Sequence, residues 1–546
     1  MKKLVHLALL PLFFISLSCS SEWIPVDLLV QNATVYTVDE FFTTVDAFVV
    51  KDGKIVETGT MEELASKYSP AEIYDAGGKV IVPGLIDAHA HLYGLGGSLQ
   101  TVDLVGTKSY DEVLERVVAF QKEKNLSFIQ GRGWDQNDWE VKEFPTKDKL
   151  DALFPDTPVV LRRIDGHALL ANSKALELGG VTPDTYVEGG EVIVKDGKLT
   201  GVLVDAPMSM VYTNAPDVTN ENAAQALLDA ENICLSLGLT TVNDAGLSRR
   251  IIELIDSLQQ RGEMKLRVYA MASNYKENLD HFLSKGIIKT DRLHVRSVKV
   301  YADGALGSRG AALKAPYSDQ PGHFGAMITT EEQLNALAQR IATAGYQMNT
   351  HAIGDSANVA VLRAYTKALK DKTDARWKVE HAQVVDVSDF DYFSKNIIPS
   401  VQPTHATSDM YWAEDRVGPD RIKGAYAYKT LLNKAGIIAL GTDFPVEQVN
   451  PMYTFYAAVA RKDLENYPEG GFRMEESLSR EEALRGMTIW AAYSNFEEDE
   501  KGSLEVGKFA DFIVLDRDIM KVDEATLPST KVLATFINGE NVTPKK

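Results

Sequence analysis

Cysteine is scarce in this sequence, because its 546 residues include only two, Cys19 and Cys234. Cys19 falls in a predicted leader segment, and if it carries a lipid there, Cys234 has no second thiol to pair with. In that case no intrachain disulfide is possible. The fold must be stabilised by apolar packing, and a chain of this length is long enough for one large core with a smaller second domain.

Basic residues are outnumbered, since 57 Lys and Arg stand against 77 Asp and Glu and the net charge is -20. This balance argues against nucleic acid as a partner, because phosphates require a basic face. It also disfavours electrostatic adhesion to anionic lipid. The plainest interpretation is that the charge keeps the protein soluble, and a small molecule is the expected partner.

Long apolar runs are also missing. A largely apolar stretch at residues 4–17 follows two lysines, and no later run approaches the roughly 18 apolar residues of a membrane helix. The stretch itself is shorter than the roughly 20 residues that such a helix needs. A basic start, a short apolar run and small residues after it indicate an export signal over residues 1–19.

The end of this leader, SLSCS, resembles a bacterial lipoprotein processing site, in which the cysteine becomes the lipid-bearing first residue. Ser16 departs from the pattern, because such sites more often have a branched apolar residue there. A plain secretory signal cleaved nearby is therefore the alternative. We expect an exported bacterial lipoprotein that is anchored in the membrane only through Cys19 and faces the periplasm or the cell surface.

Two stretches at opposite ends of the chain share a pattern of short strands and tight turns. Residues 27–58 contain an Asp-Gly turn, and the segments ADFIVLDRD and KVLATFINGENV repeat the style around an Asn-Gly turn. Neither stretch has enough strands to cover both faces of a sheet by itself. We therefore expect one small β-sandwich domain built from both termini, over residues 22–80 and 503–546.

Between these ends, apolar strands alternate with amphipathic helical segments, which predicts a parallel sheet with crossover helices. Strands are expected at residues 81–91, 239–246, 266–272, 295–304, 346–355, 378–383, 398–406 and 437–445. Eight such units are what a (β/α)8 barrel requires. The predicted fold class is therefore α/β, with a TIM-type barrel over residues 81–502.

The interval after the first of these strands is too long for one crossover. It must hold an inserted α/β subdomain, over about residues 105–235, in which an Asp-Gly turn at residues 196–197 marks a hairpin. Because the insert leaves from the loop after the first strand, we expect it to roof the cavity at that end of the barrel.

Polar residues recur at the carboxyl ends of the predicted barrel strands, where such barrels build their active sites. His89 and His91 are two residues apart on one strand, so both side chains point the same way, and His351, His381 and Asp443 end three other strands. One such residue alone is more often structural. Together they would repel or dehydrate one another at a cost that a bound cation removes, so we predict a divalent metal site, and neutral imidazole suits zinc well.

Lys299 lies on the fourth of these predicted strands. Strand alternation places Lys299, Tyr301 and Asp303 on one face. An ammonium group cannot ligate a cation, but CO2 addition to the amine would give a carbamate whose two oxygens can bridge two metals. The alternative is an ordinary lysine that pairs with Asp303 or Asp443, and the spacing alone does not decide between them.

Several segments resemble the amidohydrolase superfamily: VPGLIDAHAHL, TDFP and GSLEVGKFADFIVLD. Others, GRGWDQNDW, RRIDGHALLANSKAL, KVYADGALGSRGAAL and KVEHAQVV, resemble the branch that includes N-substituted formamide deformylase. The likeness runs from about residue 26 to 542 and is specific for the branch, not for the substrate.

The resemblance implies metal ligation by His89, His91, His351 and His381, a bridging carbamate on Lys299, and one or two divalent ions. It implies that Asp443 is both a ligand and the proton carrier. A departure is Asn243, because relatives often have His at this place, and so the contribution of the second strand is in doubt.

With these residues, the resemblance implies hydrolysis of an amide, formamide or cyclic amide C–N bond by a metal-activated hydroxide. His405 is expected to stabilise the oxyanion. The candidate substrate-binding residues are Trp134, Asp135, His167, Asp303, Arg309, Gln402 and Asp409. For the three residues of the insert, a purely structural role is the alternative. Two other functions stay open: a lipid-anchored solute-binding protein on a hydrolase scaffold, and a hydrolase of lactone or ester C–O bonds. A homodimer is compatible with either.

Overall fold

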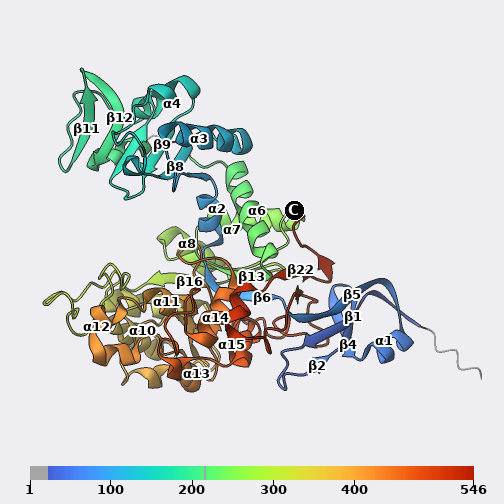
Figure 1. The fold of residues 1–546 in the computed structure, drawn as a ribbon. Coiled ribbons are helices and arrows are strands. Elements are labelled where there is room, and N and C mark those ends of the chain that lie inside the picture. Colours follow the sequence, from blue (N-terminus) through green and yellow to red (C-terminus); the bar gives the residue numbers. More distant parts are fainter. Residues whose placement is uncertain (1–22, 214, 216, 546) are drawn as a thin grey trace, which may run out of the picture.

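The computed structural model describes residues 23–213, 215 and 217–545. The predicted leader and Cys19 lie outside the described residues. In the part of the chain that is described, no helix is long and apolar enough to cross a membrane. Three parts follow one another in space: a sheet at the termini, a barrel, and a lobe that projects from the barrel (Figure 1).

Eight parallel strands form the barrel, and each coincides with one of the strands predicted from the sequence. In sheet order they are β6 (Leu85–Ala90), β13 (Leu239–Leu247), β14 (Arg267–Ser273), β16 (Leu293–Tyr301), β17 (Gln347–Ala352), β18 (Trp377–His381), β19 (Ile397–Val401) and β20 (Ala439–Leu440). A short ninth strand, β15 (Ile288–Lys289), pairs antiparallel with β16. The predicted fold class, an α/β barrel of the TIM type, is confirmed.

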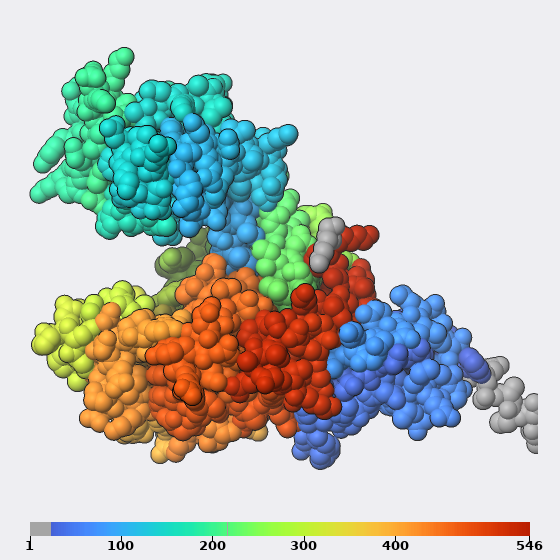
Figure 2. Space-filling view, viewed as in Figure 1, coloured from blue at the N-terminus to red at the C-terminus, as the bar shows by residue number. Residues whose placement is uncertain are grey.

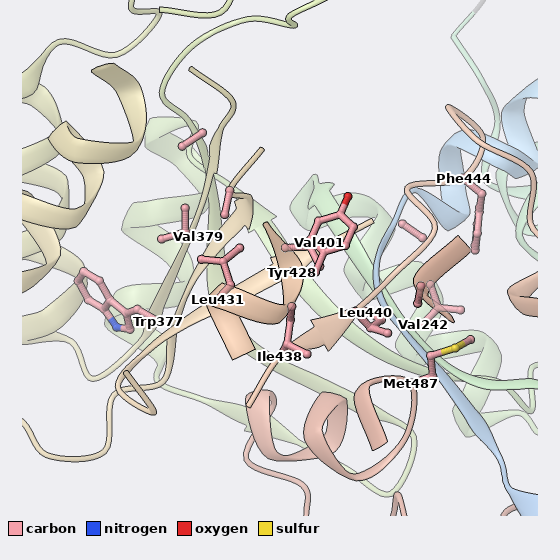
Figure 3. Packing of buried hydrophobic residues seen from close by; sticks show 14 of the residues in the cluster. Val242, Trp377, Val379, Val401, Tyr428, Leu431, Ile438, Leu440, Phe444 and Met487 are labelled. Carbon is pink, nitrogen blue, oxygen red and sulfur yellow. The ribbon is translucent and has the colours of Figure 1, made fainter. Parts of the chain in front are cut away.

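Helices follow the barrel strands along the chain. They are α6 (Asn220–Ser236), α7 (Arg249–Gln260), α8 (Lys276–Lys285), α9 (Glu331–Thr343), α10 (Asp355–Ala368), α11 (Pro403–Asp409), α12 (Ala413–Arg421), α13 (Tyr428–Ala435), α14 (Pro451–Ala460), α15 (Arg480–Gly486) and α16 (Ile489–Ser494). Figure 3 shows Val379 and Val401, from neighbouring strands, beside Tyr428 and Leu431 of α13. Because such close packing resists displacement, it holds the strand ends in fixed positions.

The barrel closes between its first and last strands through one buried carboxylate. Asp87 on β6 accepts from the hydroxyl of Thr442 at 2.7 Å and from its amide at 3.1 Å. The amide of Asp443 then donates to the carbonyl of His89 at 2.8 Å. Gly441 is required at the seam, because a Cβ there would lie 2.6 Å from the His89 nitrogen. Asp443 is thereby fixed beside the first strand.

The insert is a separate lobe with its own six-stranded sheet. Its elements are β7 (Thr101–Asp103), α3 (Tyr110–Lys124), β8 (Ile129–Trp134), α4 (Asp148–Leu153), β9 (Val159–Arg163), β10 (Ala168–Ala171), α5 (Ser173–Leu178), β11 (Gly190–Lys195) and β12 (Lys198–Asp205). α2 (Leu92–Ser98) and α6 join it to the barrel, and Figures 1 and 2 show it as a distinct body. Its apolar side chains pack on one another to form cores of its own.

Strands from both termini form one eight-stranded sheet. They are β1 (Ile24–Tyr36), β2 (Thr44–Val45), β3 (Ala47–Lys51), β4 (Lys54–Gly59), β5 (Tyr68–Pro83), β21 (Phe512–Leu515), β22 (Val532–Ile537) and β23 (Glu540–Asn541), and α1 (Met61–Lys67) follows β4. Alternate residues of β1 are buried on its two faces, so that Leu28 and Leu29 enter different cores. The guanidinium of Arg267 on β14 donates to Asp511 at 2.7 Å, which ties this sheet to the barrel.

Candidate metal-dependent active site

The predicted metal ligands converge at the carboxyl ends of the barrel strands. Oδ1 of Asp443 lies 3.2 Å from Nε2 of His91 and 3.5 Å from Nε2 of His89. Oδ2 of the same carboxylate lies 3.6 Å from Nε2 of His405. The ring centroids of His351 and His381 are 4.5 Å apart. Residues from five separate strand ends therefore share one site.

Two groups of side chains have the spacing of a metal site, and Asp443 belongs to both. One group is His89, His91 and Asp443, and the other is His381, His405 and Asp443. In each group, one donor atom per residue lies within 4.8 Å of the others. Because Asp443 offers two oxygens, a single carboxylate can serve both groups.

Hydrogen bonds decide which imidazole nitrogen faces the site. Nδ1 of His89 lies 2.6 Å from Oε2 of Glu380, and Nδ1 of His91 lies 3.0 Å from the carbonyl of Ala245. Nδ1 of His381 lies 2.7 Å from the Gln402 side-chain oxygen. These oxygens can only accept, so each Nδ1 carries a hydrogen. Each Nε2 is therefore left with the lone pair that a metal requires.

Several donor atoms at this site are buried without a partner. Among the described residues, Nε2 of His351, Nε2 of His405 and Oδ1 of Asp443 have no hydrogen bond. Leaving such atoms unpaired costs free energy. A cation bound between them would remove that cost, and a donor set of imidazole and carboxylate suits a divalent metal such as zinc. The residues present fit a metal.

Burial favours the form of each imidazole that can bind metal. It lowers the pKa of His351 to about 3, and it lowers the pKa values of His89 and His381 as well. Burial acts to raise the pKa of Asp443, but the neighbouring imidazoles, His91 first among them, hold this pKa well below its usual value. At neutral pH these three buried imidazoles are thus neutral, and they lie beside an ionised carboxylate.

Lys299 lies inside the same cluster. Its Nζ is 2.9 Å from Nε2 of His89, and burial lowers the pKa of its amine. Asp303 is not its partner, because that carboxylate accepts from three backbone amides on the neighbouring loops. The ordinary ion pair with Asp303, which strand alternation left open, is therefore absent from this site.

A cavity of about 400 Å³ opens above these residues. Its polar lining consists of His91, Lys299, Tyr301, His351, His381, Gln383, His405, Asp409, Asp443 and Glu447. Asp409 accepts hydrogen bonds from Gln383 at 3.1 Å and from the hydroxyl of Tyr426 at 2.8 Å. The aromatic ring of Trp412 forms part of the wall. The volume suits a small molecule.

Backbone strain marks two of the site residues. His381 has φ of 71° and Asp443 has φ of 62°, both in the left-handed region. Non-glycine residues adopt this region at a cost, and functional sites are a common place for it. The seam hydrogen bond from the Asp443 amide fixes the backbone there, and Asp443 lines the cavity.

Other residues that the sequence nominated for substrate binding lie elsewhere. Trp134 is buried in the insert, where its indole donates to the Leu161 carbonyl, and the adjacent Asp135 pairs with Arg163 at 2.6 Å. His167 is 75% exposed and pairs with Asp205. Of the described residues that line the cavity, none comes from the insert. The expectation that the insert roofs the cavity is wrong, because no described residue of the insert lines it and the lobe stands apart from the barrel (Figure 1).

Arg309 and Gln402 do not line the cavity either. Arg309 pairs with Asp319 at 2.8 Å, while Gln402 is buried and orients His381 instead. Glu380, Gln383 and Glu447 were not nominated from the sequence. A usable signal existed for Glu380, since a lone charged residue on an apolar strand beside a candidate ligand indicates a site partner.

Asn243, on the second strand, is no ligand. It exchanges hydrogen bonds with Asn495 at 2.8 and 3.0 Å and donates to the carbonyl of Ala88. The second strand reaches the site through Ala245 instead, whose carbonyl holds His91. The doubt about this strand as a source of ligands is thereby resolved in favour of a supporting role.

The barrel and its cavity of imidazoles and carboxylate together define a metal-dependent hydrolase. Residues 72–543 match the Amidohydrolase family, and the chain belongs to that family. The chain is 33% identical over 524 residues to the protein YtcJ of Bacillus subtilis (strain 168), covering 94% of this chain and 98% of that one. It is 27% identical to N-substituted formamide deformylase of Arthrobacter pascens, covering 94% and 97%.

A solved structure has the same fold. The crystal structure of an uncharacterized metal-dependent hydrolase from Pyrococcus furiosus matches with a TM-score of 0.76 and 31% sequence identity. The match covers 90% of this chain and 100% of that chain. The family and this neighbour both imply a divalent metal. The predicted membership of the amidohydrolase superfamily is confirmed.

Proposed function

We propose that this chain hydrolyses a C–N bond of a small molecule, as an amide, formamide or cyclic amide hydrolase. The observation that carries the proposal is the carboxylate of Asp443, which faces two groups of candidate ligands at once. The similarity to N-substituted formamide deformylase supports the choice of bond. A pure solute-binding protein would gain nothing from a base at this position.

The residues that would hold the metal are His89, His91, His351, His381 and Asp443, and we propose zinc as the ion. A divalent ion bound there lowers the pKa of water and polarises a carbonyl oxygen. The protein supplies the rest. It fixes the imidazole tautomers, excludes bulk water from buried donors, and keeps the carboxylate at the barrel seam.

Asp443 and His405 carry the proposed chemistry of the chain itself. Asp443 accepts the proton of the attacking water and returns it to the departing amine, because an amide nitrogen leaves poorly as an anion. His405 donates to the oxygen of the tetrahedral intermediate, since its Nε2 is buried at the cavity and has no partner among the described residues. Asp409 at the cavity wall contacts the substrate.

Lys299 is the proposed site of a carbamate. Its amine is buried among the candidate ligands, where an ammonium would oppose a cation. The test is 13C NMR of zinc-loaded protein prepared with labelled bicarbonate. A carbamate signal that is lost in Lys299→Met supports the modification, and an identical spectrum for both proteins contradicts it.

Metal analysis combined with a substrate panel tests the function. The panel pairs N-formyl and N-acetyl amines with esters and lactones of the same carbon skeleton, and Asp443→Asn serves as the inactive control. We expect zinc in the purified protein and turnover of the C–N compounds. Turnover of the esters alone would favour C–O hydrolysis. Tight binding without turnover of any compound would favour a solute-binding protein.

We also propose that the protein is exported and anchored by a lipid on Cys19, on the strength of the leader sequence. Metabolic labelling with a fatty acid tests this in cells that express the full chain. The wild type should carry label and sediment with membranes, and Cys19→Ala should do neither. An unlabelled wild type found free in the periplasm would favour the plain secretory signal.

A further inference from the structure

We propose that Glu380 is a positioning residue of the metal centre, whose carboxylate holds His89 in the orientation that presents Nε2 to a cation. The inference rests on the proposed ligation by His89. Oε2 of Glu380 lies 2.6 Å from Nδ1 of His89, and both side chains are 0% exposed. An ionised carboxylate can only accept, so Nδ1 carries the hydrogen and Nε2 keeps its lone pair.

The hydrogen-bond partners of Glu380 differ from those of the buried carboxylates that stabilise the backbone. Asp303 accepts from three backbone amides, and Asp87 accepts from two backbone amides and a hydroxyl. Within the described part of the chain, the Glu380 carboxylate has one hydrogen-bond partner, His89, and its Oε1 has none. Burying a carboxylate is costly. A buried carboxylate whose hydrogen bonds go to a single imidazole therefore indicates a role at that imidazole.

The place of Glu380 in the chain adds a second reason. It immediately precedes His381 on β18, and the ring centroids of His89 and His381 are 4.9 Å apart. One strand thus supplies a candidate ligand and also orients a ligand from β6, on another side of the barrel. Small shifts of β18 would move both imidazoles together. Glu380 couples the two strands at the site.

Two substitutions and one matched control test the role. Glu380→Leu removes the acceptor, and Glu380→Gln keeps an acceptor oxygen without the charge. The control is Glu497→Gln, because Glu497 is also buried and lies 3.2 Å from a histidine, His294, but does not line the cavity. All proteins are supplied with the same zinc and compared for zinc content, for the rate of zinc transfer to a chromogenic chelator, and for the absorption spectrum of the cobalt-substituted form.

We expect Glu380→Leu to weaken zinc binding by about 10- to 100-fold. Glu380→Gln should lose less, because its amide oxygen can still accept from Nδ1. Glu497→Gln should lower the thermal midpoint but retain zinc and the cobalt spectrum of the wild type. A merely structural role for Glu380 would lower the midpoint without changing the cobalt spectrum.

Wild-type zinc retention and an unchanged cobalt spectrum in both Glu380 variants would overturn the proposal. So would a zinc loss in Glu497→Gln equal to that in Glu380→Leu. If Glu380→Leu does not fold, Glu380→Gln decides by the same two measurements. A wild type that binds zinc but hydrolyses no compound would contradict the proposed function only. The role of Glu380 would still be tested by zinc binding. A wild type that binds no divalent metal overturns both.

Discussion

Oδ1 of Asp443 lies 3.2 Å from Nε2 of His91, although the two residues come from the last and the first strands of the barrel. The contact depends on the seam, where the amide of Asp443 donates to the carbonyl of His89. Closing the barrel and assembling the site are therefore the same structural event. A substitution that keeps the seam but changes the carboxylate should separate stability from catalysis.

Asp443→Asn is that substitution, because its amide has the same shape and the backbone bonds remain. We expect kcat to fall by about 10³-fold, since the proton acceptor is lost. Circular dichroism and the thermal midpoint should stay close to those of the wild type. Turnover within a few-fold of the wild type would remove Asp443 from the proposed mechanism.

The barrel and the convergence of the candidate ligands were predictable because both leave local signals. Several barrel strands contain apolar runs that end in polar residues, as at 437–445, and His89 and His91 lie at the end of one such strand. The position of the insert was not predictable, because it depends on how one lobe sits on two connecting helices. Nor was the role of Gln402, which binds His381 from a separate strand. Contacts between distant segments leave no periodicity to detect.

Removing the metal should abolish activity reversibly. After dialysis against 1,10-phenanthroline, we expect hydrolysis to be lost and then restored by added Zn²⁺, because the imidazoles remain in place without it. The non-chelating isomer 1,7-phenanthroline is the control. Zinc should also raise the thermal midpoint, since a ligand that binds only the folded state stabilises it. The zinc bound per chain at full activity measures whether one ion or two are required. Activity that survives complete removal of metal contradicts the proposed chemistry.

The position of His405 allows two roles, donor to the oxyanion or metal ligand. It lines the cavity, and its Nε2 lies 3.6 Å from Oδ2 of Asp443. As the proposed donor to the oxyanion, its replacement in His405→Ala should lower kcat by about 10²-fold and leave zinc content unchanged. His405→Gln retains a donor and should recover part of the rate. Loss of zinc in both variants would make His405 a ligand instead.

Lys378 tests how a buried amine near the site affects the stability of the protein. Its Nζ donates to Oδ1 of Asn495 at 2.7 Å, and burial lowers the pKa of its amine to about 8. In the unfolded chain the pKa is about 10.4. Between these two values the unfolded state binds the extra proton, so the stability of the wild type rises with pH across this window. Below pH 8 the buried ammonium is a cost.

Lys378→Met should therefore be more stable than the wild type at pH 7.5, by about 3 kcal/mol from the difference between the two pKa values. Asn495 keeps a hydrogen bond from Asn243 at 3.0 Å, so the substitution does not leave its oxygen unpaired. The advantage of the variant should shrink as the pH rises toward 10. Urea unfolding at both pH values measures it, with Lys276→Met, whose lysine is 89% exposed, as the control. Equal pH dependence of stability in Lys378→Met and in the exposed-lysine control would refute the burial argument.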